Sequence, residues 1–155
     1  MEKQEIMKQQ EKFLFIRAAA IIIKDNKLLT ARNAGSPHYT IGGRIEINET
    51  SEEAVIREIY EETGYTLEID RLVYINERFI EVDGQKCHEI VFYYLMKNNI
   101  DINIQDGCFT DQAPTETLHW LPIDSLAKTD LVPPFLRIKS FDDIVGIEHI
   151  ISKEY

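Results

Sequence analysis

Alternating and continuous runs of apolar residues divide the chain into short strands and one amphipathic helix. Two apolar stretches, residues 13–23 and 27–32, flank the turn formed by Asp25 and Asn26, and this pattern predicts a β-hairpin. The other expected elements are strands at 38–41, 67–79, 88–96, 115–121 and 144–151, short helices at 122–128 and 133–140, and a polar loop at 98–114.

The most periodic segment predicts a helix over residues 51–63. Thr50 and Glu53 have the spacing of a capping box, and Gly64 stands where a glycine commonly ends a helix. On such a helix the acids at i, i+3 and i+4 share one side, and the apolar residues take the other. The acids are Glu58, Glu61 and Glu62, and the apolar residues are Val55, Ile56, Ile59 and Tyr60.

The grouped acids are unfavourable for the helix taken alone. Like charges four residues apart cost about 0.2–0.5 kcal/mol per pair, and acids in the last turns oppose the helix dipole. A divalent cation, which prefers oxygen ligands, would reverse both effects. A plain solvated acidic face is the alternative interpretation, and the residues around the helix decide between the two. Gly42 and Gly43 precede it, so the backbone there can approach a ligand closely.

Length and composition indicate one globular α/β domain. The chain has 155 residues, of which 44% are hydrophobic and 28% charged. Residues 1–12 are polar and are expected to form an arm or a short helix, with the domain covering residues 13–155. The sequence shows neither an apolar run long enough to span a membrane nor a secretory leader, which predicts a cytoplasmic protein without a membrane partner.

The net charge and the cysteines exclude two kinds of function. The formal net charge is −10, from 27 acids and 17 bases, and this argues against strong nucleic-acid binding. A phosphate-bearing ligand remains compatible if a divalent cation lies between it and the protein. Cys87 and Cys108 are expected to be reduced thiols, and two such distant cysteines exclude a cysteine-based zinc site.

The segment around the helix resembles the signature of the Nudix (MutT-like) hydrolases. That signature has a glycine, a glutamate six residues later, and then Arg-Glu-apolar-any-Glu-Glu-any-Gly-apolar. The chain fills every place, with a bulky tyrosine in the last one: Gly43, Glu49, Arg57, Glu58, Ile59, Glu61, Glu62, Gly64 and Tyr65. The family's Leu-Pro-Gly-Gly reads Thr40-Ile41-Gly42-Gly43 here, without the proline.

The resemblance implies an α/β/α sandwich with a mixed β-sheet and a site for Mg²⁺, or alternatively Mn²⁺. Carried over by position, Glu58 and Glu62 are the main expected metal ligands. Glu61 is expected as a third ligand and the Gly43 carbonyl as a fourth. Glu49 is expected to contribute indirectly, and Arg57 to orient the acids.

The resemblance also implies a reaction, the hydrolysis of a pyrophosphate bond in a nucleoside diphosphate linked to another group. Substrates of this class include nucleoside triphosphates, modified dNTPs and nucleotide sugars. The alternative is a nucleotide-binding or regulatory module of the same fold that has lost catalysis. Homodimers are common in the family, so the assembly stays open.

The general base lies outside the signature and varies in the family. Glu116, just before the strand at residues 118–121, is the first candidate, and Asp111 in the same loop is the second. For substrate binding, Arg32 and Arg44 are candidates to bind phosphate, and Tyr39 is a candidate to stack on a base. Ordinary surface or core roles are the alternative for all three.

Overall fold

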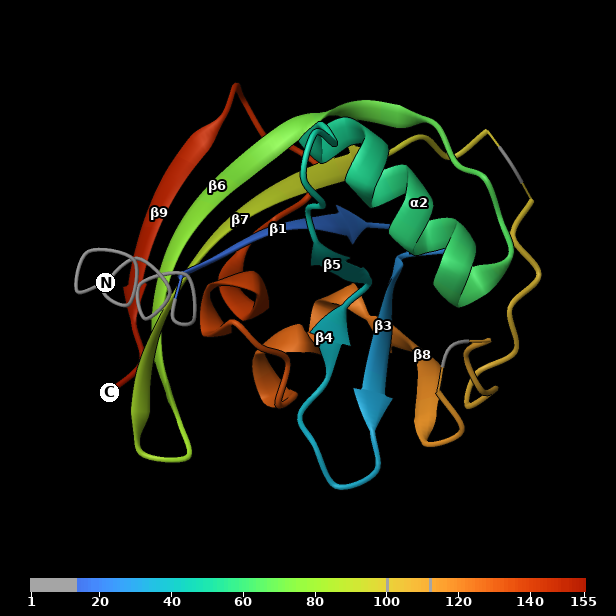
Figure 1. Cartoon of the computed structure of the whole chain (residues 1–155). Helices are drawn as coiled ribbons and strands as arrows, with labels where there is room; N and C mark the ends of the chain where they lie inside the picture. Colours follow the sequence, from blue (N-terminus) through green and yellow to red (C-terminus); the bar gives the residue numbers. More distant parts are fainter. Residues whose placement is uncertain (1–13, 100, 112) are drawn as a thin grey trace.

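The protein is described by a computed structural model covering residues 14–99, 101–111 and 113–155 (Figure 1). The larger of two sheets has five strands in the order β5-β1-β7-β6-β9. Its strands are β1 (Leu14–Ile21), β5 (Gly42–Arg44), β6 (Ile69–Val82), β7 (Gln85–Met96) and β9 (Glu148–Lys153). Strand β1 pairs parallel with β7 and antiparallel with β5, so this sheet is mixed.

The smaller sheet is built around one central strand. Strand β3 (Lys27–Asn33) pairs antiparallel with its three partners β2 (Ile23–Lys24), β4 (Tyr39–Thr40) and β8 (Glu116–Pro122). The expected hairpin is therefore confirmed only for β2 and β3, which turn at Asp25 and Asn26, both with positive φ. Strand β1 was expected to be part of this hairpin and instead joins the larger sheet. Residues 18–22 are all buried, and a strand covered on both faces needs partners on both edges.

The helix α2 (Ser51–Thr63) has the predicted bounds. The Thr50 side chain accepts a hydrogen bond from the Glu53 amide, the Glu53 carboxylate accepts one from the Thr50 amide, and Gly64 ends the helix at φ 77°. Asp83 and Gly84 have φ of 50° and 76°, which suits the tight turn of the β6–β7 hairpin.

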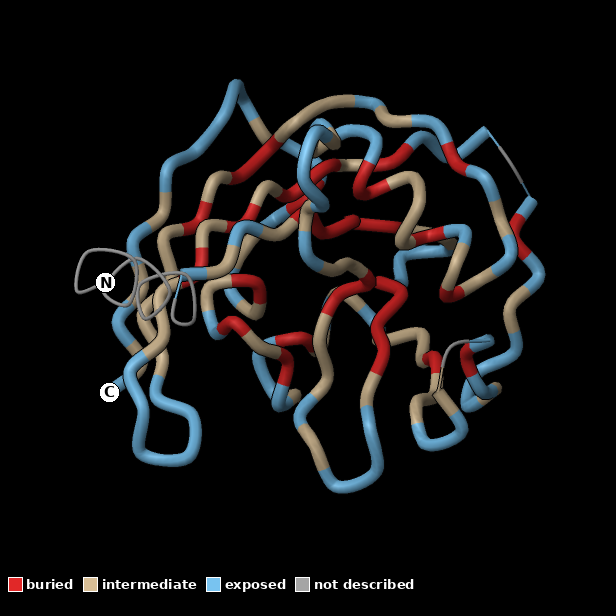
Figure 2. Tube along the Cα trace, in the orientation of Figure 1, coloured by how far each residue is buried: buried red, intermediate tan, exposed pale blue. Residues whose placement is uncertain are grey.

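The residues of β1 serve two cores on opposite faces of the larger sheet. Ala18 and Ala20 pack with residues of α2 and the smaller sheet. Ala19 and Ile21 pack on the other face, beneath the 3-10 helices η1 (Ile123–Lys128) and η2 (Pro134–Ile138). Buried residues accordingly run through the centre of the molecule between these layers (Figure 2).

The expected mixed α/β sandwich is confirmed, with α2 over one face of the larger sheet and 3-10 helices over the other. The last strand begins later than predicted, at Glu148. Residues 101–111 contain neither helix nor strand, as expected for that part of the loop. The predicted N-terminal arm lies outside the described residues. Within the described residues, none of the helices has the length and apolar character required to cross a membrane.

Candidate active site

Arg57, in the middle of α2, binds three acids at once. Its Nε and Nη2 donate to the two carboxylate oxygens of Glu49, over 2.6 and 2.9 Å. Its Nη1 donates to Glu58 Oε1 at 2.8 Å and to Glu61 Oε2 at 3.2 Å. Nη2 also donates to the carbonyl oxygen of Arg44 at 3.1 Å. One planar guanidinium thus ties the loop before α2 to two of the helix acids.

The pairing with Arg57 changes the acidity of Glu49. Hydrogen bonds from Arg57, and then from the backbone amide of Glu46, lower the pKa of Glu49 to about 2. Glu49 therefore stays ionised at any physiological pH and holds Arg57 in place. This geometry is compatible with the indirect role expected for Glu49 and the orienting role expected for Arg57.

Glu62 has the opposite environment. It is 8% exposed, and its Oε2 has no hydrogen-bond partner. Burial first, and then the negative charges of Glu116 and Glu58, raise the pKa of this carboxyl to about 9, while the charge of Arg17 acts in the opposite direction. Without a cation, Glu62 therefore keeps a proton at neutral pH.

Gly43 leaves room for the carboxylate of Glu58. A Cβ placed on Gly43 would lie 2.2 Å from Glu58 Oε1, far inside contact distance. The neighbouring Gly42 is crowded by backbone instead, with the carbonyl oxygen of Ala18 at 2.3 Å from an added Cβ. The first glycine of the pair thus permits the β1–β5 pairing, and the second permits the close approach of an α2 acid.

Glu116 lies next to the α2 acids because β3 brings two strands together. Asn33 of β3 pairs with Glu116 of β8, and Ala31 pairs with Tyr39 of β4. The Tyr39 hydroxyl donates a hydrogen bond to Glu116 Oε2 and accepts one from Asn33 Nδ2 at 3.0 Å. The other candidate base, Asp111, lies at the end of α2, where its Oδ2 would be 3.8 Å from a Cβ on Gly64.

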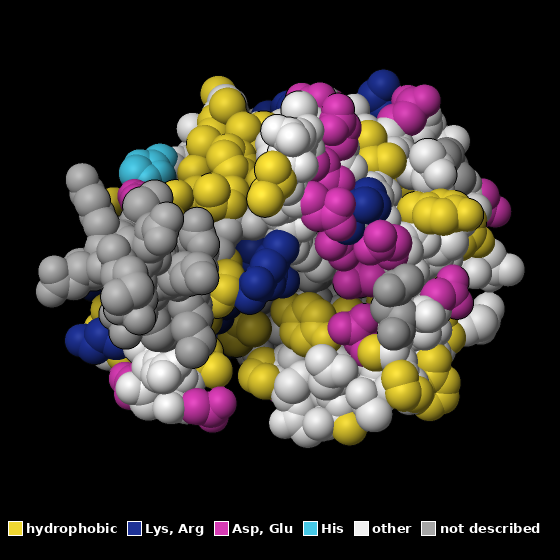
Figure 3. Space-filling view, viewed as in Figure 1, with side chains coloured by type: hydrophobic (Ala, Val, Ile, Leu, Met, Phe, Trp, Pro, Cys, Tyr) yellow, Lys and Arg dark blue, Asp and Glu magenta, His cyan; other side chains and the backbone are white. Residues whose placement is uncertain are grey.

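The acids of α2 suit a hard divalent cation in their chemistry. They supply carboxylate oxygens, including the buried and unpartnered oxygen of Glu62, beside a glycine that leaves the backbone accessible. As they stand, no three acids, histidines or cysteines of the described residues form a group that could hold a metal ion. In this arrangement Arg57 binds one carboxylate oxygen of Glu58 and one of Glu61. Acidic side chains gather over α2 on the surface (Figure 3).

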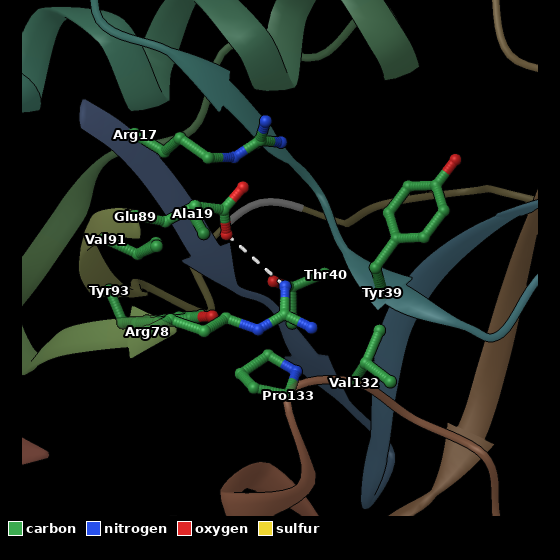
Figure 4. Close-up of a pocket in the computed structure, with 11 residues that line it drawn as sticks. Arg17, Ala19, Tyr39, Thr40, Arg78, Glu89, Val91, Tyr93, Val132 and Pro133 are labelled. Carbon is green, nitrogen blue, oxygen red and sulfur yellow. Dashed lines mark hydrogen bonds and ion pairs between the residues drawn. The ribbon is translucent and has the colours of Figure 1, made fainter. Parts of the chain in front are cut away.

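A pocket of about 240 Å³ has two lining residues, Arg17 and Tyr39, that interact electrostatically with Glu62 (Figure 4). Its lining comes from strands β1, β4, β5, β6 and β7 and from Val132 and Pro133. Two arginines, Arg17 and Arg78, line it together with Glu89. Arg17 lies on the side of the pocket toward the helix (Figure 4), and its positive charge lowers the pKa of Glu62, Tyr39 and Tyr93 against the larger effects that raise it.

Of the three residues expected to bind substrate, one lines this pocket. Tyr39 is at its rim. Arg32 donates through Nε to the carbonyl oxygen of Ser36 at 3.0 Å, and Arg44 lies 4.0 Å over the ring of Phe15. Neither arginine contributes to the pocket lining.

Arg17, Arg78 and Glu89 were not predicted as pocket residues from the sequence. All three are charged residues inside strands that are otherwise mostly apolar, rather than in loops. A charged residue at an inward position of a strand is expensive to bury without a partner or a ligand. That signal was present in the sequence, but the facing strands needed to assemble the pocket could not be seen from it.

Known proteins resemble this chain in sequence. A sequence profile of the NUDIX domain covers residues 14–139. Putative nudix hydrolase 1 of Caenorhabditis elegans is 36% identical over 119 residues, which is 70% of this chain and 29% of that protein. An ADP-ribose pyrophosphatase of Methanocaldococcus jannaschii is 44% identical over 57 residues, 34% of each protein. The chain spans about a third of the length of the curated relatives it matches.

The fold is shared with solved structures of the same class. A MutT protein from Bacillus halodurans superposes with a TM-score of 0.66 at 20% identity, covering 87% of this chain and 89% of that one. The architecture and the sequence profile therefore agree on the class of protein. The chain belongs to the Nudix domain family.

Proposed function

We propose that the chain is a metal-dependent hydrolase of a pyrophosphate bond. The observation that carries this proposal is the juxtaposition of two features: the α2 acids fixed by Arg57, and a pocket lined by arginines that opens beside them. Phosphate groups need positive charge, and the acids need a cation. A diphosphate bound through a divalent ion satisfies both requirements.

Glu58 and Glu62 would hold the metal, with Glu61 as a third ligand and the Gly43 carbonyl as a fourth. Mg²⁺ is the proposed ion and Mn²⁺ the alternative, since both prefer oxygen ligands. When bound, such an ion neutralises phosphate oxygens and lowers the pKa of a coordinated water. The buried carboxyl of Glu62 would lose its proton on loading, because a ligating carboxylate must be ionised.

Glu116 is the proposed general base. Its Oε2 accepts the hydrogen bond from Tyr39, while Oε1 receives none from a described residue. A water oxygen would form the new bond to one phosphorus as the bridging P–O bond breaks. The proton of that water would pass to Glu116, and the pair of electrons would leave with the second phosphate. Tyr39 would position the carboxylate for this transfer.

The proposed substrate is a nucleoside diphosphate linked to a further group. Nucleoside triphosphates, modified dNTPs and nucleotide sugars belong to this class. Proteins similar to this chain include an ADP-ribose pyrophosphatase and a UDP-X diphosphatase, which fits this class. Arg17 is the described pocket residue best placed to bind the diphosphate, because it is the one of the two pocket arginines whose charge acts on Glu62.

A panel of nucleotides with and without Mg²⁺ tests the proposal, with phosphate or nucleoside monophosphate release as the measurement. Hydrolysis of at least one member that stops on chelation of the metal is the expected result. Tight nucleotide binding with no turnover across the panel would contradict it and favour the catalytically silent binding module.

The proposal includes a cytoplasmic location and a homodimeric assembly. Cys87 and Cys108 are both free thiols, which suits the reducing cytoplasm. A homodimer remains a prediction from the family resemblance, which sedimentation of the purified chain would test.

A further inference from the structure

Glu89 of β7 is a buried acid whose carboxylate is only partly engaged. It is 9% exposed and lines the pocket. Its Oε2 accepts a hydrogen bond from Arg78 Nη1 at 3.3 Å. Its Oε1 receives no hydrogen bond from a described side chain or amide, and it points away from Arg78, on the side of Arg17 (Figure 4). Glu89 Oε1 does not belong to the fully buried, unpartnered oxygens of the described residues, so it is reached from the pocket and can accept a hydrogen bond from a ligand.

Arg78 holds Glu89 in this orientation and is itself held from behind. Glu154, directly after β9, accepts from Arg78 Nε at 2.6 Å and from Nη2 at 3.0 Å. The Glu154 amide is fixed in turn by the Phe79 carbonyl oxygen at 2.9 Å. Arg78 is therefore engaged by two carboxylates, which makes it a positioning residue rather than a free phosphate binder.

These contacts give the pocket two electrically different sides. Arg17, on the side of the α2 acids, has no ion pair with a described residue and carries one positive charge. Glu89 lies between Arg17 and Arg78 (Figure 4), and Arg78 is outnumbered by Glu89 and Glu154, which leaves one net negative charge on that side. A ligand with an anionic group at one end and a hydrogen-bond donor at the other matches this polarity.

We propose that Glu89 is the residue that selects the nucleoside part of the substrate, by accepting a hydrogen bond at Oε1 from an N–H or O–H group. This inference rests on the proposed function, which places the diphosphate on the Arg17 side. Val91, Tyr93 and Pro133 add apolar surface to the pocket lining, as a flat base or a sugar ring requires. The donor is a base amino or ring N–H group or a ribose hydroxyl, and these share the same chemistry at Glu89.

Paired substrates that differ by one donor test the proposal. One pair differs in the 2′-hydroxyl, and the other in the exocyclic amino group of the purine, guanine against hypoxanthine. The wild type should favour the donor-bearing member of one pair at least tenfold in kcat/KM, because a hydrogen bond to a charged group contributes about 1.5–3 kcal/mol. The pair that responds identifies the source of the donor.

Glu89→Gln should erase that preference, raising KM for the favoured substrate about tenfold while kcat changes little. Glu81→Gln, an exposed acid of β6 that does not line the pocket, is the matched control and should keep the wild-type preference. Thermal unfolding checks that both variants fold. A Glu89→Gln variant that keeps the wild-type ranking of both pairs would overturn the proposal, as would a wild type indifferent to both.

Calorimetry with the corresponding nucleoside monophosphates separates this inference from the proposed function. If the wild type hydrolyses nothing but binds the donor-bearing monophosphate more tightly, and Glu89→Gln loses that difference, the proposed function fails and the selection by Glu89 stands. If hydrolysis is observed and neither kinetics nor binding responds to Glu89, the proposed function stands and this inference fails.

Discussion

The candidate site has two parts, the α2 acids, called the acidic end below, and the pocket, called the pocket end. These two parts are built in different ways. The acidic end comes from one continuous segment, residues 43–65, in which the helical repeat alone sets the relative positions of Glu58, Glu61 and Glu62. The pocket end is assembled from β1, β4, β6 and β7 and from Val132 and Pro133, far apart in the chain. Local sequence thus encodes the chemistry, whereas tertiary packing encodes the group that is recognised.

The largest effect is expected at the acidic end, from Glu58→Gln. The amide cannot replace a charged metal ligand, so kcat should fall by about a hundredfold or more while the fold persists. Steady-state kinetics at saturating Mg²⁺ and thermal unfolding measure the two quantities. Glu52→Gln, in the exposed first turn of α2, is the control and should keep full activity. Near-normal turnover of Glu58→Gln would contradict the assignment of α2 to the active site.

Arg57→Lys should have the next largest effect. Lysine keeps the charge but cannot reach Glu49, Glu58 and Glu61 with one planar group. Losing a residue that orients metal ligands typically costs about 10–100-fold in metal affinity or activity. A titration of activity against Mg²⁺ would show the loss as a raised metal requirement, and an unchanged titration would contradict the orienting role.

Alanine substitutions of Gly42 and Gly43 should have different effects, one on stability and the other on activity. Gly43→Ala crowds the end of the Glu58 side chain, which can move, so activity should fall about tenfold with little loss of stability. Gly42→Ala crowds the backbone of β1, which cannot easily move, so the melting temperature should drop instead. Equal losses of stability in both variants would refute this distinction.

The raised pKa of Glu62 predicts a pH dependence of stability without metal. The native state keeps this proton between the ordinary pKa of 4.5 and about 9, whereas the unfolded chain releases it. The free energy of unfolding contributed by Glu62 should therefore fall as pH rises through that window. Urea unfolding in a chelator at pH 5 to 9 would show a shallower decline for Glu62→Gln than for the wild type. Parallel curves would contradict the buried, protonated carboxyl.

The smallest effect on the reaction is expected at the pocket end, from Glu154→Gln. The neutral amide weakens the two hydrogen bonds between Arg78 and residue 154 but leaves the Arg78–Glu89 hydrogen bond possible. KM should rise a few-fold and the preference between donor-paired substrates should shrink, with kcat unchanged. Loss of kcat with the substrate preference intact would indicate that Glu154 acts only through stability.

The difference between the two ends also explains what the sequence could predict. The bounds of α2 follow from Thr50, Glu53 and Gly64, which act within a few residues of the helix ends. Glu116 could be suggested because it stands at the start of a strand, and the structure places it beside Glu62. Arg17 and Glu89 could not, because their meeting depends on the parallel pairing of β1 with β7. Local patterns specify strands but not their neighbours.

The run Ala18–Ala19–Ala20 in β1 has a consequence for how such a protein can diversify. These three small residues, each at most 6% exposed, let α2 pack on one face of the strand while the pocket opens on the other. Side chains on β6 and β7 at the pocket can then be exchanged without touching the acids across the strand. Under the proposed function, mutations on the pocket side of β1 would change the specificity while leaving the reaction of the α2 acids unchanged.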